Sequence, residues 1–348
     1  MISIVLGSFF GDEGKGQCVN NLCTNDSIVI RFSGANQVGH NVRHNSIDHC
    51  FRNFGSGTLK GIPTYWSEYC VCDLHTVLLE LMELQQLGVT PKIIFSPFCE
   101  LVTPFDVINQ WNNQENRKHG TVGTGFKSTL DRVKNGYSLT IADAKNIFIL
   151  REKVFNIQHN YYKFSSDVPT ADLTDWIIGV NKMANTFEVQ DIEYLNTYKD
   201  LIFEGSQGIL LDQKHGVMPF CTPSNTTSKN AIEIINKLGR IETPVINYVC
   251  RPYITRHGSG PLLTTTSVIS VDDKNNQWNE FQRSFRACEF DIDLLKHSIY
   301  IDSLYSKDAK RVIMFSHAKE LSEDLRFKLY NLYGVEGVMS FEYETFVN

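Results

Sequence analysis

Two carboxylates and a lysine lie together in a glycine-rich loop near the start of the chain. Residues 11–16 read GDEGKG, between an apolar, β-branched run at Ile2–Leu6 and a helix-compatible pattern at Cys18–Leu22. A strand, a glycine loop and a helix form a phosphate cradle, because glycine lets backbone N–H groups approach an anion and the helix N-terminus adds unpaired donors. Lys15 adds a full positive charge, so the stretch predicts phosphate binding.

The loop departs from the ordinary P-loop in a way that suggests chemistry. The P-loop motif places Ser or Thr directly after its lysine, whereas Gly16 and Gln17 follow Lys15 here. Asp12 and Glu13 lie among the amides instead, where a carboxylate would repel phosphate unless it held a metal or acted as a base. Taken alone, the loop is equally compatible with a tight turn that carries a solvated acidic pair.

Strand-like and helix-like segments alternate along the chain around this loop. The expected strands are Ser27–Phe32, Lys92–Phe95, Leu201–Phe203, Pro244–Cys250, Arg311–Phe315 and Val338–Tyr343, and the expected helices are Asp73–Gly88, Ala231–Gly239 and Lys319–Tyr333. We expect Met82 and the leucines of the Asp73–Gly88 helix to be core residues. Residues 137–200 have a helical pattern without motifs. The sequence predicts an α/β fold with a mainly parallel central sheet, flanking helices, a P-loop-like nucleotide-binding core and a helical insertion at 137–200, within a single domain at 1–348.

Composition limits the class of partners. The 348 residues carry a net charge of −6 without a dense Lys/Arg cluster, which argues against binding to a nucleic-acid duplex or an anionic membrane. No apolar run is long enough to span a membrane, and the N-terminal run stops at Gly7, too early for a signal peptide. The nine cysteines are scattered, with only Cys70 and Cys72 close together, so we expect free thiols and a cytoplasmic protein.

Several segments, in the same order, resemble the adenylosuccinate synthetase family. They are GDEGKG at 11–16, RFSGANQVGH at 31–40, FEGSQGILLD at 203–212, HGVMPFCTPSNTT at 215–227 and TRHGSGP at 255–261. The resemblance thins beyond these segments. It implies a ligase that uses a nucleoside triphosphate to phosphorylate the 6-oxo group of a purine monophosphate, and then joins aspartate at C6.

The resemblance also implies roles for two catalytic residues. Asp12 matches the family's base, which removes the N1 proton and holds Mg²⁺ together with the backbone carbonyl of Gly39. His40 matches the family's acid at O6, where an imidazolium stabilises the developing oxyanion. The 6-oxo oxygen is amide-like and a poor leaving group, so it must first become a phosphate ester. Transfer of the γ-phosphate needs a cation that neutralises its charge, and the implied cofactor is therefore Mg²⁺.

Further ligands are carried over from matching positions. Residues expected at the nucleoside triphosphate are Gly11, Glu13, Gly14, Lys15, Gly16, Gly39, His40, Ser316 and Lys319. Residues expected at the purine monophosphate are Asp12, Asn20, Gln37, Thr121, Val122, Gln207, Thr222, Arg256 and Gly258. At Val122 a family hydroxyl is missing, which leaves that contact to a backbone N–H or to Thr124. Arg283 and Arg286 are expected to bind aspartate, because a planar fork suits carboxylates.

Departures from the family pattern limit which substrates are expected. Asn20 stands where cellular members place an aspartate close to the purine. A neutral amide in place of that carboxylate changes which purine edge the site accepts, notably at C2. The guanine-reading Lys-x-Asp of the family falls on SHAK at 316–319, which has no carboxylate for the guanine N1 and N2 protons, so ATP or dATP is the expected phosphate donor. The chain is also shorter than cellular enzymes.

This combination resembles the phage branch of the family that serves diaminopurine DNA, the 2-amino-2′-deoxyadenylosuccinate synthetases. We therefore expect dGMP, ATP and L-aspartate as substrates, a homodimer, and the host cytoplasm as location if a phage encodes the chain. The alternatives are an ordinary adenylosuccinate synthetase that uses IMP and a non-catalytic nucleotide-binding regulator. A mere binder would have no need of a base and an acid.

Overall fold

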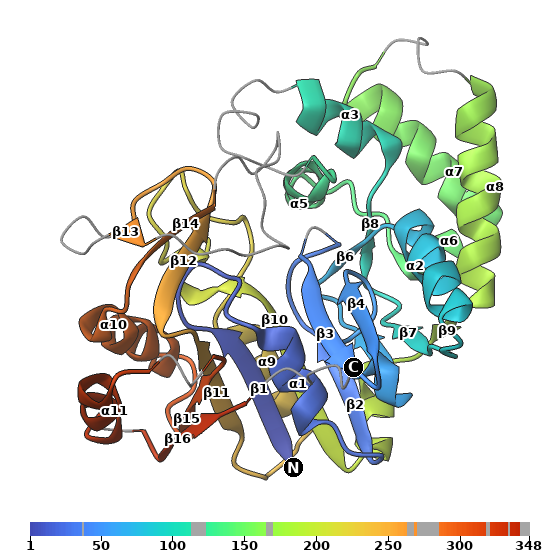
Figure 1. Ribbon diagram of the computed structural model, residues 1–348. Coiled ribbons are helices and arrows are strands. Elements are labelled where there is room, and N and C mark those ends of the chain that lie inside the picture. The colour runs from blue at the N-terminus through green and yellow to red at the C-terminus, as the bar shows by residue number, and fades with distance from the viewer. Residues whose placement is uncertain are drawn as a thin grey trace.

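A parallel sheet forms the centre of the protein. The computed structural model describes residues 1–36, 38–112, 123–164, 170–262, 268–269, 285–317, 321–332 and 335–341. Within them, the largest sheet has nine strands in the order β16-β15-β11-β1-β10-β2-β5-β7-β9, and all its pairings are parallel (Figure 1). The α/β fold with a mainly parallel central sheet and flanking helices is confirmed.

The strands of this sheet are short and mostly apolar. They are β1 (Ile2–Gly7), β2 (Ser27–Arg31), β5 (Thr64–Trp66), β7 (Ile93–Phe95), β9 (Glu188–Val189), β10 (Asp200–Gly208), β11 (Val245–Cys250), β15 (Lys310–Phe315) and β16 (Gly337–Ser340). All six residues of β1 are buried, as is typical of parallel strands that are covered on both faces. β10 extends well beyond the predicted Leu201–Phe203, and it therefore carries the FEGSQG segment.

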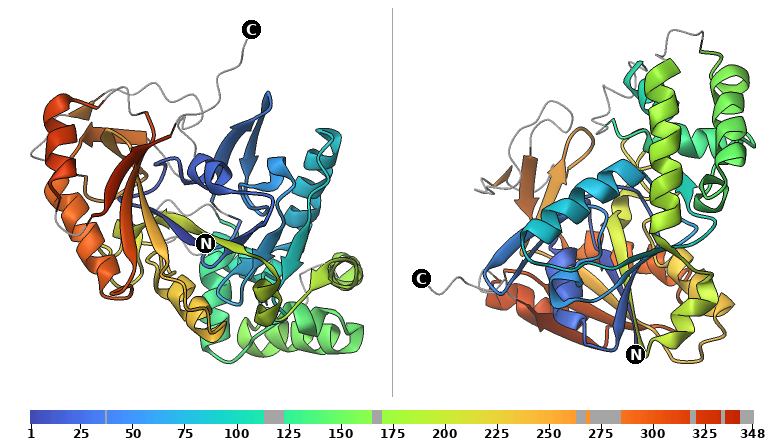
Figure 2. Two further views of the ribbon diagram at one scale, coloured as in Figure 1. Left: turned by 90° about the horizontal axis from the view of Figure 1, so that it is seen from below. Right: turned by 90° about the vertical axis from the view of Figure 1, so that its right-hand side faces the viewer.

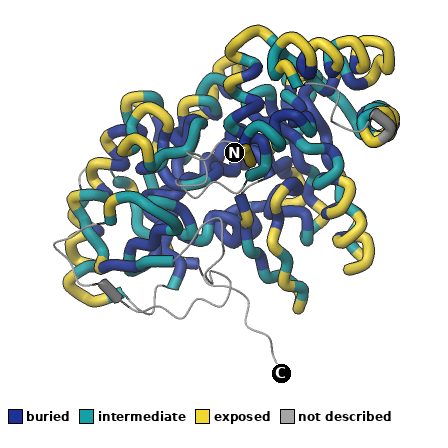
Figure 3. The backbone as a smooth tube through the Cα atoms, turned by 90° about the horizontal axis from the view of Figure 1, so that it is seen from above, coloured by how far each residue is buried: buried dark blue, intermediate teal, exposed yellow. Residues whose placement is uncertain are grey.

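Helices cover both faces of the sheet (Figures 1 and 2). They are α1 (Lys15–Leu22), α2 (Leu74–Gln86), α3 (Pro104–Asn112), α5 (Phe126–Lys134), α6 (Ile141–Ala144), α7 (Ile147–Asn156), α8 (Thr170–Thr186), α9 (Lys229–Lys237), α10 (Ile292–Ser303) and α11 (Glu323–Tyr330). Val5 packs with Cys18 and Val19 of α1, whereas Ile4 on the opposite face belongs to the cluster that contains α9 and α10. Burial is greatest along the strands and least on the outer helices (Figure 3).

Helix α2 has the predicted N-terminal cap but not the predicted burial of all its leucines and Met82. Asp73 caps it as predicted, because its carboxylate accepts the N–H of His75 at 3.0 Å. Leu74, Val77 and Leu84 are buried, but Leu79 and Met82 are 60% and 49% exposed. The prediction that Met82 and all the leucines are core residues is therefore wrong, because the outer side of the helix also carries apolar side chains.

The smaller elements lie around the sheet. A hairpin joins β3 (His40–His44) to β4 (Ile47–Phe51), β6 (Val71–Cys72) pairs with β8 (Glu100–Leu101), and β14 (Phe285–Glu289) pairs with β12 (Tyr253–His257) and β13 (Val268–Ile269). Short 3₁₀-helices lie at Thr58–Lys60, Ile192–Thr197 and Ile209–Leu211, and a short π-helix lies at Ile157–Tyr161. Over residues 137–200 the described elements are mainly helical, yet this stretch also supplies the edge strand β9.

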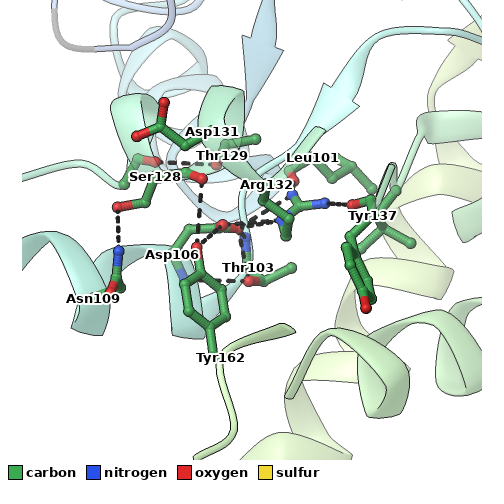
Figure 4. Close-up of polar contacts among 12 residues, drawn as sticks. Leu101, Thr103, Asp106, Asn109, Ser128, Thr129, Asp131, Arg132, Tyr137 and Tyr162 are labelled. Atoms are coloured by element: carbon green, nitrogen blue, oxygen red, sulfur yellow. Dashed lines mark hydrogen bonds and ion pairs between the residues drawn. The ribbon is translucent and has the colours of Figure 1, made fainter. Parts of the chain in front are cut away.

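A buried ion pair joins α3 to α5 (Figure 4). Nε of Arg132 lies 2.9 Å from Oδ1 of Asp106, and both side chains are fully buried. The Asp106 carboxylate also accepts the hydroxyls of Thr103 and Tyr162, while Nη2 of Arg132 donates to Leu101 O at 2.8 Å. This ion pair therefore fixes α3 and α5 relative to each other.

Two further observations bear on the class of protein. Among the described residues, no helix combines the length and the apolar character that a membrane crossing would need. All nine cysteines are free, and seven of them are buried (Cys18, Cys23, Cys70, Cys72, Cys99, Cys250 and Cys288).

Candidate active site

The glycine loop leaves β1 in a left-handed conformation. Gly11, Asp12 and Gly14 have φ values of 102°, 62° and 100°. Such a φ is easy for glycine but unfavourable for aspartate, and strain of this kind clusters at functional sites. Gly14 caps α1 without a side-chain hydrogen bond, so the first N–H groups of the helix have no side-chain acceptor at the cap and can bind an anion.

Glu13 turns inward and stabilises the loop. Its Oε1 accepts the backbone N–H groups of Phe9 at 3.0 Å and Gly11 at 2.9 Å, and its Oε2 pairs with Nζ of Lys15 at 3.0 Å. Its side chain is 3% exposed. The carboxylate expected at the nucleotide is thus used within the loop, which leaves any contact of Glu13 with a ligand to its backbone.

Asp12 turns the other way. Its side chain is 30% exposed, and its Oδ2 lies 3.4 Å from Nε2 of His257 at the end of β12. Burial raises the pKa of Asp12, while the nearby His257 and Lys15 oppose the rise. A carboxylate with a raised pKa is a stronger base, which suits a general base.

His40 forms a buried pair with Glu204 of β10. Its Nδ1 lies 2.5 Å from Oε1 of Glu204, which also accepts the hydroxyl of Ser56, while Oε2 accepts the Ser56 N–H at 3.1 Å. Burial alone would raise the pKa of Glu204, but His40, Arg31 and Ser56 lower it to about 2. The ionised carboxylate therefore accepts Nδ1–H, which fixes the ring as in other carboxylate–histidine pairs.

The other nitrogen of His40 is available to a ligand. Nε2 is buried and has no hydrogen-bond partner among the described residues. Burial lowers the pKa of His40, and Arg31 and Lys15 add to this effect, whereas Glu204 opposes it. No role was predicted for Glu204, although the sequence carries one signal, a lone carboxylate directly after the apolar run Leu201–Phe203.

Gln207, which is expected at the purine, lies beside the glycine loop. It is the penultimate residue of β10 and has a left-handed φ of 57°, and its Oε1 lies 3.6 Å from the position that a Cβ of Gly11 would take. A Cβ on the adjacent Gly208 would collide with the carbonyl of Phe9. Thr255 of β12 closes the other side, since its hydroxyl donates to Gly11 O at 3.0 Å.

Ser316 also contacts this loop, at the end of β15. Its buried hydroxyl donates to Glu13 O at 2.9 Å. The proton expected at the nucleotide is thus used to hold the backbone of the loop, and only the hydroxyl oxygen is left to accept from a ligand.

Two arginines lie beside each other near β12 and β14. Arg256 donates to the carbonyls of Phe220 at 3.0 Å and Pro261 at 2.7 Å and stacks on Phe10 at 4.3 Å, while Arg286 donates to Gly258 O at 2.6 Å. Burial and the charge of Arg286 lower the pKa of Arg256 to about 10. Two neighbouring cations that bond to carbonyls make a place for a ligand with carboxylates or phosphates. Thr222 lies close in sequence to Phe220 and is held by its N–H to Leu211 O at 2.8 Å.

Asn20 lies one turn after Gly16 on α1. Its side chain is buried, and its Oδ1 has no hydrogen-bond partner among the described residues. Helical side chains lean toward the N-terminus, so Asn20 lies against the turn of Gly16, where a Cβ would come within 2.8 Å of His40 Cβ. Its backbone carbonyl accepts Nζ of Lys60 at 2.6 Å, which holds this end of the helix.

Some expected ligands cannot be located. Gln37, Thr121, Val122, Arg283 and Lys319 lie outside the described residues. Gly39 is described; a Cβ there would come within 2.8 Å of Cys50 Sγ. The described part of the chain holds no cluster of three or more His, Cys, Asp or Glu side chains suited to a metal.

Comparisons with known proteins identify the family of this chain. The adenylosuccinate synthetase family profile matches residues 4–320. The adenylosuccinate synthetase of Dechloromonas aromatica (strain RCB) is 28% identical over 94% of this chain and 80% of its own length. That of Saccharophagus degradans (strain 2-40) is 27% identical over 86% and 74%.

Solved structures share the fold. The fully ligated adenylosuccinate synthetase of Plasmodium falciparum superposes with a TM-score of 0.73 at 19% identity, over 92% of this chain and 78% of that one. The succinoaminodeoxyadenylate synthetase of cyanophage S-2L, bound to dGMP and dATP, gives 0.67 at 14% identity, over 98% and 91%. The chain therefore belongs to the adenylosuccinate synthetase family of ligases, which use a nucleoside triphosphate.

Proposed function

We propose that this ligase joins L-aspartate to C6 of dGMP with ATP, and releases 2-amino-2′-deoxy-N6-succinyladenylate, ADP and phosphate. The observation that carries the choice of dGMP is the side chain of Asn20, a buried amide whose Oδ1 lacks a partner among the described residues. A guanine has N2–H donors that hypoxanthine lacks, and an amide oxygen accepts them without a fixed charge. The cyanophage enzyme that is similar in fold is described with dGMP bound, which supports this choice.

The first chemical step is phosphorylation of O6. Asp12 takes the N1 proton, O6 forms a bond to the γ-phosphorus, and the bond from that phosphorus to the β,γ-bridging oxygen breaks. Nε2 of His40 is proposed to contact the transferring group, and the pair with Glu204 at 2.5 Å holds the ring in place. In the second step the amine nitrogen of aspartate bonds to C6, the C6–O6 bond breaks so that phosphate leaves with O6, and the departing phosphate takes the proton that the amine loses.

Two oxygen donors of this chain, the carboxylate of Asp12 and the backbone carbonyl of Gly39, would hold Mg²⁺. Asp12 offers one partly exposed carboxylate, and the backbone carbonyl of Gly39 would be the second protein ligand. Mg²⁺ usually keeps several waters and substrate oxygens among its six ligands, so two protein ligands suffice. When bound, it would neutralise charge on the phosphates.

The proposed aspartate-binding residues are Arg283 and Arg286, of which the structure describes Arg286, the register partner of Arg256. Arg256 and Arg286 hold two positive charges close together, and the contacts of both guanidiniums are to carbonyls and an aromatic ring. An aspartate with two carboxylates would balance those charges. We further propose that the active unit is a homodimer.

An IMP-dependent adenylosuccinate synthetase is the second candidate. The relatives from Dechloromonas aromatica and Saccharophagus degradans are named adenylosuccinate synthetase, at 28% and 27% identity, which supports this candidate. A regulator without activity would not need Asp12 and His40 in their present arrangement, and release of ADP that depends on aspartate would exclude it.

A substrate matrix tests the proposal. Product formation is measured with dGMP and IMP, each with ATP and GTP, at equal concentrations and with aspartate omitted as the control. We expect dGMP with ATP to give the highest kcat/KM. If IMP is used as well as dGMP or better, the ordinary synthetase takes the place of this proposal.

A further inference from the structure

A histidine that has no assigned role lies beside Asp12. His257 is the last residue of β12, and its Nε2 lies 3.4 Å from Oδ2 of Asp12. Among the described residues, no other side chain forms an ion pair with the Asp12 carboxylate. The Asp12 side chain is 30% exposed, so packing alone does not fix the direction in which its two oxygens point.

Strand β12 contacts the glycine loop at two points. Side chains two residues apart on a strand point to the same face, and Thr255 and His257 are related in this way. The hydroxyl of Thr255 donates to Gly11 O at 3.0 Å, and Nε2 of His257 faces the carboxylate of the next loop residue, Asp12. The strand therefore holds the loop backbone through Thr255 and is placed to hold the proposed base through His257.

The ring of His257 is itself held by a neighbour. Phe285 of β14 is its register partner in the antiparallel pair, and the two ring centres lie 5.0 Å apart at an interplanar angle of 54°. Cross-strand pairs of aromatic rings stabilise each other's arrangement. His257 is 15% exposed, so most of the ring is shielded from water where it meets Asp12.

The chemistry of the two groups sets the direction of their contact. An ionised carboxylate has only acceptors, whereas a neutral imidazole has one N–H donor. A neutral ring with its proton on Nε2 is therefore sufficient to hold Oδ2 of Asp12, and no charge on His257 is needed. The separation of 3.4 Å is long for a hydrogen bond, as is common for catalytic contacts before the substrate binds.

We propose that His257 is a positioning residue, whose Nε2–H holds Oδ2 of Asp12 and so leaves Oδ1 for the N1 proton of the purine. The backbone at Asp12 has a left-handed φ of 62°, but the backbone alone does not select the rotamer of the carboxylate. His257 makes that selection. The link to turnover rests on the proposed role of Asp12 as the base, whereas the position of its carboxylate does not.

The kinetic test compares His257→Leu, which removes the donor, with His257→Gln, whose amide supplies an N–H at similar reach. His75→Leu is the matched control, because Nδ1 of His75 also lies beside an aspartate, 3.8 Å from Oδ1 of Asp73, and its ring stacks on Trp176, but on α2. We expect His257→Leu to lower kcat by roughly 10- to 100-fold, since a misplacement of about 1 Å can cost roughly 100-fold. KM for the nucleotide should change little, His257→Gln should recover most of the rate, and His75→Leu should match wild type.

A double variant shows whether His257 acts through Asp12. When Asp12 is already replaced in Asp12→Asn, the added His257→Leu has no carboxylate left to misplace. We therefore expect the double variant to be slower than Asp12→Asn by less than about twofold, which is the usual error of additivity. A loss as large as the one that His257→Leu causes in the wild-type background would overturn the proposal, because His257 would then act on another group.

The crystal structures of the ligand-free proteins give a readout without turnover. We expect Asp12 to keep its rotamer in wild type, His257→Gln and His75→Leu, and to take another rotamer in His257→Leu. An Asp12 side chain that keeps its place in His257→Leu would overturn the proposal. If His257→Leu does not fold, His257→Asn takes its place under the same criteria, because its shorter amide does not reach Asp12.

This proposal and the proposed function fail in different ways. An Asp12→Asn enzyme with wild-type turnover would remove Asp12 as the base, and the crystal structures would still decide whether His257 holds its side chain. A wild-type enzyme that prefers IMP would remove dGMP as substrate, and the kinetic test would then use IMP. A folded His257→Leu enzyme with unchanged kcat would remove His257 from the mechanism and leave the choice of nucleotide untouched.

Discussion

Oδ2 of Asp12 lies 3.4 Å from Nε2 of His257, while its sequence neighbour Glu13 pairs with Lys15 at 3.0 Å. Adjacent carboxylates in one loop thus have different neighbours and different surroundings. Asp12 is left partly exposed with a raised pKa, and Glu13 is fully committed to the loop. The roles of Asp12 and Glu13 can therefore be distinguished by experiment.

Asp12→Asn should lower kcat by roughly 10²- to 10⁴-fold, the usual contribution of a general base, without a large change in melting temperature. Glu13→Gln should mainly lower the stability of the protein. It leaves Lys15 buried and unpaired, which costs about 3–5 kcal/mol of unfolding free energy. Steady-state kinetics and thermal unfolding of both variants check this. Equal losses of stability in the two would contradict the division of roles.

His40→Asn should slow phosphoryl transfer and leave nucleotide binding nearly unchanged. One preorganised donor at a developing oxyanion contributes about 2.7–4 kcal/mol to the barrier, so kcat should fall by about the same factor as kcat/KM. Single-turnover measurement of ADP formation checks it. A raised KM with an intact kcat would make His40 a binding residue only.

Glu204 should give the protein a defined acid sensitivity. Its pKa is lowered to about 2 from 4.5, so its stabilising contribution is fully present above pH 4.5 and is lost as pH falls toward 2. The difference in unfolding free energy between wild type and Glu204→Gln should therefore shrink from pH 6 to pH 3. Urea unfolding at both pH values measures it, and a difference that is constant with pH would show that the carboxylate is not ionised by its partners.

Asn20→Asp should reduce the preference for dGMP over dIMP. A site that hydrogen-bonds a substrate N–H can reject the analogue without it by roughly 10⁴- to 10⁵-fold, and an added carboxylate alters that edge of the pocket. Asn21→Asp is the matched control, because Asn21 is the exposed neighbour on the same helix. The ratio of kcat/KM for the two nucleotides is the measurement. Equal ratios in wild type and Asn20→Asp would remove Asn20 from base recognition.

Arg286→Met should raise the KM for aspartate and leave that for dGMP nearly unchanged. The guanidinium of Arg286 bonds to Gly258 O and Gly260 O at 2.6 and 2.9 Å, so Arg286→Lys serves as a control that keeps the charge but not the planar fork. Initial rates against aspartate at saturating nucleotide check it. A change confined to the nucleotide KM would move Arg286 to the purine site.

The sequence predicted the local features well and the long-range ones less well. The β1 strand, the loop around Asp12 and the cap at Asp73 depend on neighbouring residues, which a pattern can reveal. The pairing of Glu204 with His40 and the contact of His257 with Asp12 depend on residues that are far apart in sequence. The exposure of Met82 depends on what covers α2, which an amphipathic pattern alone does not specify.

The close packing of the glycine loop has a consequence for how this enzyme could diversify. A Cβ at Gly7 would collide with the Glu13 carboxylate, one at Gly208 would collide with Phe9 O, and one at Gly16 would come within 2.8 Å of His40 Cβ. These three glycines therefore tolerate almost no substitution. Asn20 lies one turn away on a helix and carries no such backbone constraint. New nucleobase preferences should arise there first, and a saturation library at this single codon is the shortest route to altered substrates with the chemistry intact.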